Sequence, residues 1–124
     1  MPLQARMVVS GLSAIQSQAS VGTVANALTA TGSTQAGALP LPADLNRFTT
    51  VAAGTGALLP PMNPGDELEV INAGANALLV YPPLGSNGVI NVLGANAGYS
   101  VAVATPTCFV QCITPTIFAA TQSA

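Results

Sequence analysis

The densest set of side chains that could carry chemistry is acidic: Asp66, Glu67 and Glu69 follow a turn at Pro64-Gly65. If this segment is a strand, Glu67 and Glu69 share one face about 6.6 Å apart, because alternate residues point the same way. Such a pair could hold a calcium ion, act as a paired acid and base, or form a salt bridge to a partner. We interpret it as a solvated strand face and predict no metal there.

The many serine and threonine hydroxyl groups have no visible base to activate them. The chain contains no histidine and no lysine, and a hydroxyl nucleophile needs such a base. Neither a Gly-x-Ser-x-Gly elbow nor a phosphate-binding loop is present. Gly54-Thr55-Gly56 predicts only a turn, since nothing basic or helical follows it. We therefore predict that the protein is not an enzyme and uses no cofactor.

The two cysteines, Cys108 and Cys112, lie in a segment over residues 107–113 that has the composition of a strand. Four residues along a strand span about 13 Å, whereas the Cα atoms of a disulfide are roughly 4.4–6.8 Å apart. We therefore expect two buried, free thiols. An intermolecular bridge is the alternative, and two cysteines without histidine are a weak metal signal.

Charge is scarce, since the 124 residues include only two arginines and four acidic side chains. An ordinary soluble domain is about one quarter charged, so we expect much of this surface to be covered by other protein. Two isolated arginines give no basis for binding nucleic acid, which needs clustered cations. A membrane-spanning helix needs about 20 apolar residues in a row, and Gly, Pro, Asn, Ser or Thr interrupts every apolar run here. Neither nucleic acid nor a membrane is therefore expected as a partner.

Short β-prone runs separated by Gly, Pro and Asn predict an all-β fold, namely an antiparallel β-sandwich or jelly-roll-like domain. The predicted strands cover residues 48–52, 57–59, 67–72, 77–81, 89–92, 99–104 and 108–113. Asn87-Gly88 is typical of a hairpin turn. Gly74-Ala75-Asn76-Ala77 recurs as Gly94-Ala95-Asn96-Ala97, which we interpret as one turn used at two corners of the sandwich.

Two units are expected along the chain. Residues 1–25, rich in Ser, Gln, Gly and Ala, predict an extended N-terminal arm that gains order against a partner. Residues 26–124 predict a single β-sandwich domain, to which residues 28–41 could add one or two further strands. The short apolar run after Arg6 lacks the features of a secretion signal. Synthesis in the cytoplasm is therefore expected.

Four motifs follow one another in the chain. They are Leu28-Thr29-Ala30-Thr31-Gly32-Ser33-Thr34-Gln35-Ala36, Phe48-Thr49-Thr50-Val51-Ala52-Ala53-Gly54-Thr55-Gly56-Ala57-Leu58-Leu59-Pro60, Val70-Ile71-Asn72-Ala73-Gly74-Ala75-Asn76-Ala77-Leu78-Leu79-Val80-Tyr81-Pro82-Pro83 and Gly88-Val89-Ile90-Asn91. In this order, over residues 28–104, they resemble a group of small virion proteins of tailed bacteriophages. The resemblance implies a structural protein, most directly a decoration or cement protein that binds the major capsid protein on the head surface.

Similar modules also occur in tail-associated proteins, so a tail, adaptor or receptor-binding component is the alternative function. A small enzyme or a calcium-dependent binding module is the third hypothesis. We also expect the chain to bind copies of itself as a closed homo-oligomer. A homotrimer is preferred, because head shells offer threefold and quasi-threefold positions to a cement protein.

Overall fold

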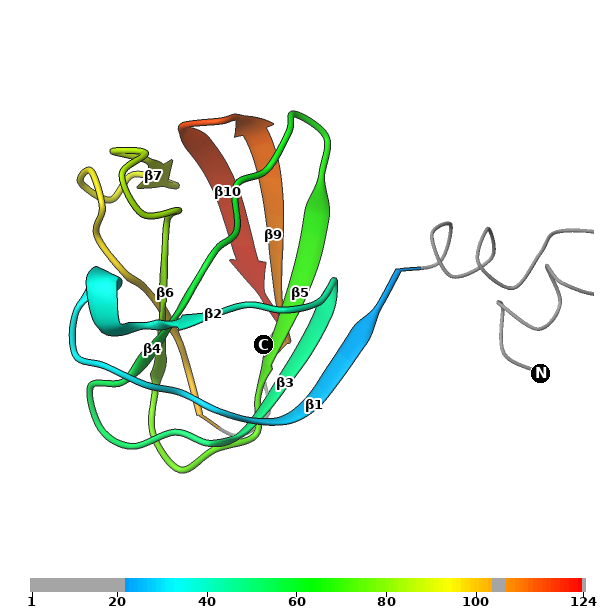
Figure 1. The fold of residues 1–124 in the computed structure, drawn as a ribbon, viewed down its shortest axis with the longest axis vertical. Helices are drawn as coiled ribbons and strands as arrows, with labels where there is room; N and C mark the ends of the chain where they lie inside the picture. Colours follow the sequence, from blue (N-terminus) through cyan, green and yellow to red (C-terminus); the bar gives the residue numbers. More distant parts are fainter. Residues whose placement is uncertain (1–21, 104–106, 124) are drawn as a thin grey trace, which may run out of the picture.

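The computed structural model describes residues 22–103 and 107–123, and within these ranges the chain is built almost entirely of β-strands (Figure 1). The one helical element of these ranges is a short 3-10 helix, η1 (Gln35–Gly37). The ten strands are β1 (Val24–Thr29), β2 (Leu39–Pro40), β3 (Leu45–Thr50), β4 (Gly56–Leu58), β5 (Glu67–Asn72), β6 (Leu78–Tyr81), β7 (Val89–Ile90), β8 (Tyr99–Val101), β9 (Thr107–Thr114) and β10 (Ile117–Gln122). The prediction of an all-β fold is confirmed.

The strands form two sheets that share one apolar core. Sheet A has six strands in the order β1-β3-β5-β9-β10-β7, and sheet B has four in the order β2-β4-β6-β8. From β1 to β9 the chain changes sheet at every step, so each sheet collects alternate strands. Figure 1 shows this path as a winding of the chain from one layer to the other and back.

Most neighbouring strands run parallel. In sheet A, β1, β3 and β5 are mutually parallel and β7 runs parallel to β10, while β2, β4 and β6 are parallel in sheet B. Among the described strand pairs, β5–β9, β9–β10 and β6–β8 are antiparallel. The predicted antiparallel arrangement is therefore wrong for the larger part of both sheets. A jelly roll, which is built of antiparallel Greek keys, is not confirmed.

The winding path explains this correction. Strands β1, β3 and β5 begin at Val24, Leu45 and Glu67, so one full turn of the path takes 21 or 22 residues. Apolar runs and turn residues locate strands but do not say which sheet the next strand enters. A hairpin makes sequential strands antiparallel, whereas a crossing to the other sheet and back makes alternate strands parallel.

At Asn87, too, a hairpin was predicted where the chain crosses to the other sheet. The residue adopts the positive φ (54°) that an Asn-Gly turn requires. The flanking strands β6 and β7 nevertheless belong to different sheets, so the predicted hairpin is wrong. The segments Gly74–Ala77 and Gly94–Ala97 were predicted to form the same turn. They differ in conformation, since Asn96 has a positive φ (61°) and Asn76 does not. They precede β6 and β8, neighbours in sheet B, but are not one turn used twice.

Strand β5 matches its predicted bounds, whereas two strands of sheet A were not predicted as such. Strand β10 begins with the β-prone Ile117 and Phe118 but continues with two alanines, which are depleted in strands. Its pairing with β9 and β7 on either side places it in the sheet. Strand β1 begins at Val24, so the last two residues of the predicted arm pair with β3. The arm up to residue 21 lies outside the described residues.

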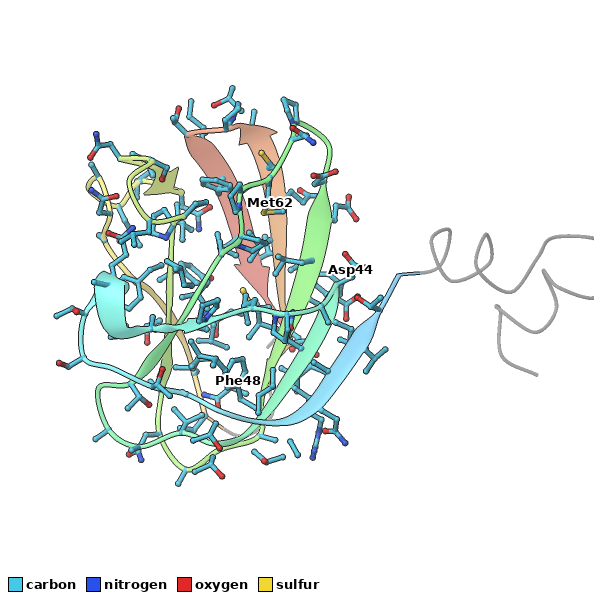
Figure 2. The ribbon with its side chains drawn as sticks, in the orientation of Figure 1. Asp44, Phe48 and Met62 are labelled. Atoms are coloured by element: carbon cyan, nitrogen blue, oxygen red, sulfur yellow. The ribbon has the colours of Figure 1, made fainter. Side chains whose placement is uncertain are left out.

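The core follows the two-residue period of the strands. On β9, Cys108, Val110 and Cys112 are each at most 2% exposed and alternate with exposed residues. Phe48 on β3 and Met62 before β5 are also buried, and Figure 2 shows both labelled side chains between the two layers.

Side-chain amides join parts of the chain where strand pairing stops. Asn72 is fully buried, and its Nδ2 donates to the carbonyl oxygens of Asn76 (2.9 Å), Val101 (3.0 Å) and Ala102 (3.1 Å). Just after β7, Asn91 exchanges two hydrogen bonds with the backbone of Ala120, both 2.9 Å. Because a buried polar group without a partner is costly, these amides fix how the sheets and loops meet.

Candidate functional site on the outer face of sheet A

Two of the acidic residues singled out by the sequence lie together on the outer face of sheet A. Glu67 and Glu69 alternate with the buried Leu68 and Val70 along β5, as predicted. Glu67 is exposed and accepts a hydrogen bond from Nε2 of Gln111 on β9 (3.0 Å). Glu69 is half-buried. The interpretation as a solvated strand face is therefore right for Glu67 and incomplete for Glu69.

Asp66 belongs to the turn before β5 rather than to this face. Its carboxylate accepts a hydrogen bond from the Asn63 N–H (2.9 Å), and its own N–H donates to the Asn63 carbonyl oxygen (3.0 Å). The Asp66 carboxylate therefore stabilises the turn, and the three acidic residues do not form one cluster.

The strand register aligns five side chains in one row across sheet A. Val24, Leu45, Glu69, Phe109 and Thr121 lie directly opposite one another on β1, β3, β5, β9 and β10. Directly opposed residues have Cβ atoms about 5 Å apart. The aliphatic part of the Glu69 side chain therefore lies between Leu45 and Phe109, which accounts for the partial burial of Glu69.

A groove of about 280 Å³ opens over this row, where β1, β3 and β5 begin. We call it the acidic groove. Its lining combines apolar side chains with three carboxylates, and the residues are Thr23, Val24, Asp44, Leu45, Glu67, Leu68, Glu69 and Phe109. A second groove of about 270 Å³ beside it includes Asp44, Asp66 and Glu67. All four acidic side chains of the chain thus line one groove or the other.

Asp44 lines the acidic groove, and Figure 2 shows it beside the start of β1. Its Oδ2 accepts hydrogen bonds from the Thr23 N–H (2.9 Å) and the Thr23 hydroxyl (3.3 Å). The same hydroxyl accepts a hydrogen bond from the Asp44 N–H (3.2 Å). This reciprocal contact fixes the place where the preceding chain enters the sheet.

A metal function finds no support in this geometry. Within residues 22–103 and 107–123, no three His, Cys, Asp or Glu side chains lie close enough to hold a metal ion. Calcium takes six to eight oxygen ligands, and two of the candidate carboxylates are engaged, Asp44 with Thr23 and Glu67 with Gln111.

The cysteines lie on the opposite, inner face of sheet A and belong to the core. Cys108 and Cys112 are buried and free, as predicted. Burial raises the pKa of the Cys108 thiol to about 11. The pKa of Cys112 is also raised, first by burial and then by the negative charge of Asp66. Since the thiolate is the reactive form, both thiols are suited to packing rather than to chemistry.

Three large apolar side chains are exposed on the outside of the β9–β10 hairpin. Phe109, Ile113 and Ile117 are 45%, 54% and 48% exposed, and we call them the hairpin patch. Phe109 also lines the acidic groove, so the patch and the groove are continuous. The outer face of sheet A therefore combines exposed apolar side chains with the acidic groove.

Sequence reasoning missed Asp44, Phe109 and Ile117 as parts of this surface. Phe109 could have been found, because residues that alternate with buried cysteines on a strand must point outward. Ile117 could not, because no strand was predicted there. Asp44 lies 23 positions before Glu67 in the chain, and their proximity follows from the winding path alone.

The described part of the chain contains no helix with the length and apolarity needed to cross a lipid bilayer. Comparison with known proteins gave no match, whether with family models, curated proteins or solved structures.

Proposed function

We propose that this protein is a structural component of a tailed-phage virion, a decoration or cement protein. It binds the outer surface of the head, stabilises contacts between major capsid protein subunits, and has no catalytic role. The motifs over residues 28–104 support this proposal through their resemblance to small virion proteins. The observation that carries it is the exposed hairpin patch of Phe109, Ile113 and Ile117, whose neighbours on β9 and β10 carry no charge.

The outer side of the hairpin suits permanent contact with another protein. The outward residues of β9 and β10 include Phe109, Gln111, Ile113, Ala119 and Thr121, none of which is charged. Burying apolar surface contributes about 25 cal/mol per Å², and none of these β9 and β10 side chains is itself an ion that would have to lose its water. Several large exposed apolar side chains on one face are typical of contact sites.

The proposal includes a closed homo-oligomer, with a trimer preferred. Strand β1, an edge of sheet A, has two register irregularities and a positive φ at Ala27 (57°). Irregular edges hinder strand-to-strand association, so copies should meet through side-chain faces instead. Analytical ultracentrifugation tests this part, and a stable monomer at micromolar concentration contradicts it.

The copy number in purified particles tests the proposed location. A decoration protein should be present in numbers comparable with the major capsid protein. A copy number that is a small fraction of the capsid protein's favours the tail, adaptor or receptor-binding function and contradicts the decoration role.

Attachment through the uncharged outer side of the β9–β10 hairpin should survive high salt. At about 1 M salt the Debye length falls to about 3 Å, which screens exposed ion pairs but not apolar contacts. The wild-type protein should therefore stay on the particle through such a wash. Phe109→Ser with Ile113→Ser should abolish attachment, whereas Val92→Ser, at a 99% exposed position in the turn after β7, should leave it unchanged. Loss in salt, or equal binding of both variants, would contradict the proposed docking face.

A further inference from the structure

The free edge of β8 is covered by a side chain instead of a strand. Strand β8 is the last strand of sheet B, with β6 on one side of it. On the other side, the Ser100 carbonyl oxygen accepts a hydrogen bond from Nε2 of Gln122 (2.7 Å). The Ala102 N–H donates to Oε1 of the same side chain (2.9 Å). The Gln122 amide therefore lies where the next strand of sheet B would lie.

The two hydrogen bonds reproduce the pairing of a parallel strand. In a parallel pair, one residue donates to the carbonyl before its partner residue and accepts from the N–H after it. Ser100 and Ala102 flank Val101 in this way, and a primary amide offers the same N–H and C=O groups as a peptide unit. Nε2 of Gln122 also donates to the Tyr99 hydroxyl (3.1 Å), which holds the amide in place.

Strand β10 directs Gln122 toward this edge. The buried Phe118 and Ala120 point to the inner face of sheet A, and Gln122 follows them with the same two-residue period. Its side chain therefore leaves sheet A on the inner face and crosses to sheet B. The next residue is fixed as well, since Ser123 exchanges two hydrogen bonds with the Thr107 backbone, both 2.9 Å.

The other three sheet edges are protected in different ways. Strand β1 has two register irregularities and a positive φ at Ala27. Strand β2 has two residues, and one of them, Pro40, has no N–H. Strand β7 is also two residues long, and the Asn91 amide covers the adjoining backbone of β10. Strand β8 (Tyr99–Val101) pairs regularly, lacks charge and proline, and contains the β-prone Tyr and Val.

We propose that the Gln122 amide blocks the β8 edge against self-association, and that the surface it covers fits the β8 edge of a second copy. Without the amide, the Ser100 carbonyl and the Ala102 N–H lose their partner, and unpaired edge groups are a template for another strand. The same edge of a second copy is regular and uncharged, and two identical edges can pair about a twofold axis.

This inference concerns the free protein and is independent of the proposed decoration role. It agrees with a homo-oligomer whose copies meet through side-chain faces, and it identifies an edge that stays out of that contact. The experiments below use no capsid, so their failure leaves the decoration proposal intact.

Hydrogen exchange measured by NMR tests whether the amide covers the edge. The Ala102 N–H of the dilute wild-type protein should exchange about tenfold more slowly than in dilute Gln122→Met, the upper range for the loss of one hydrogen bond. Methionine keeps an unbranched side chain of similar length and removes the amide. The wild-type measurement stands by itself if the variant does not fold, because an Ala102 N–H that exchanges like that of an unstructured peptide contradicts the proposal.

Analytical ultracentrifugation over a series of concentrations tests the fit to a second copy. Gln122→Met should form assemblies of at least twice the wild-type mass as the concentration rises. Adding Ser100→Lys should restore the wild-type mass, since Ser100 is exposed on β8 and a lysine on an edge strand hinders pairing. The matched control adds Val92→Lys instead, which gives the same net charge at a 99% exposed position away from the edge, and should leave the large assemblies in place.

Three results of the mass measurement would overturn the proposal. The first is a wild-type mass for Gln122→Met at every concentration, which means that the uncovered edge does not bind a second copy. The second is large assemblies that persist with Ser100→Lys, which places the contact elsewhere on the molecule. The third is equal suppression by Ser100→Lys and Val92→Lys, which means that net charge and not the β8 edge controls the association.

Discussion

The two faces of sheet A are made from the same strands, yet their large apolar side chains differ strongly in exposure. On β9 the inward residues Cys108, Val110 and Cys112 are at most 2% exposed, while the outward Phe109 and Ile113 are 45% and 54% exposed. Hydrophobicity alone therefore does not say which residues hold this fold together. The strand period does, and it divides the apolar side chains into a core and a contact surface.

The largest effect should follow a truncation on the inner face. Phe48 on β3 is fully buried between the sheets. Phe48→Ala removes most of a large side chain and leaves a cavity, so the free energy of unfolding should fall by about 3–5 kcal/mol. Urea denaturation followed by circular dichroism measures the change. A loss below about 1 kcal/mol would mean that the core is not organised around this residue.

Much of the division of side chains between the inner and outer faces of sheet A could be predicted from local sequence. The alternation of Glu67, Leu68, Glu69 and Val70 fixed the bounds of β5 and the orientation of its side chains correctly. Burial of both cysteines followed from a strand of the right composition. These features depend on a few neighbouring residues, which is where the two-residue period acts.

The parts that could not be predicted depend on which strands are neighbours. Leu45 lies opposite Glu69 because the chain crosses to sheet B and returns, and no local signal distinguishes that path from a hairpin. The acidic groove is assembled from β1, β3, β5 and β9, so it could not be found before the path was known. Strand β10 interrupts its β-prone residues with two alanines, and its place in the sheet depends on the strands that flank it, β9 and β7.

The next largest effect should come from a polar residue inside the core. Asn72→Ala leaves the Asn76, Val101 and Ala102 carbonyl oxygens without the amide that now donates to them. We expect a loss of about 2–3 kcal/mol, because unpaired buried groups keep their full desolvation cost. Gln111→Ala on the outer face is the matched control. Its amide bonds the exposed Glu67, so its loss should stay within about 0.5 kcal/mol. If Asn72→Ala and Gln111→Ala lower the free energy of unfolding equally, the two faces of the sheet do not differ in their contribution to stability.

A smaller effect should appear at alkaline pH through the inner-face thiols. The pKa of Cys108 rises from an ordinary value near 9.0 to about 11 in the folded protein. The unfolded chain therefore releases this proton first, and the stability that the protonated thiol contributes below pH 9 is lost as the pH rises toward 11. We expect about 1 kcal/mol to be lost between pH 9 and pH 10. Cys108→Ala should show less loss over the same interval when both are measured by urea denaturation, and an unchanged slope would place the titration elsewhere.

The smallest effect on stability should come from truncating a side chain on the outer face. Comparison with a truncation on the inner face of the same strand tests the difference between the two faces directly. Ile113 and Val110 lie three positions apart on β9, one half exposed and the other fully buried. Val110→Ala should cost about 2 kcal/mol through the lost burial and the cavity, whereas Ile113→Ala should stay within about 0.5 kcal/mol. The order should reverse for attachment, because Ile113 belongs to the proposed docking face and Val110 touches no partner. Denaturation of the free protein and retention on the particle, measured on the same two variants, test both statements. If Ile113→Ala destabilises the free protein as much as Val110→Ala, the hairpin patch contributes to the fold itself, and its exposure no longer argues for a partner.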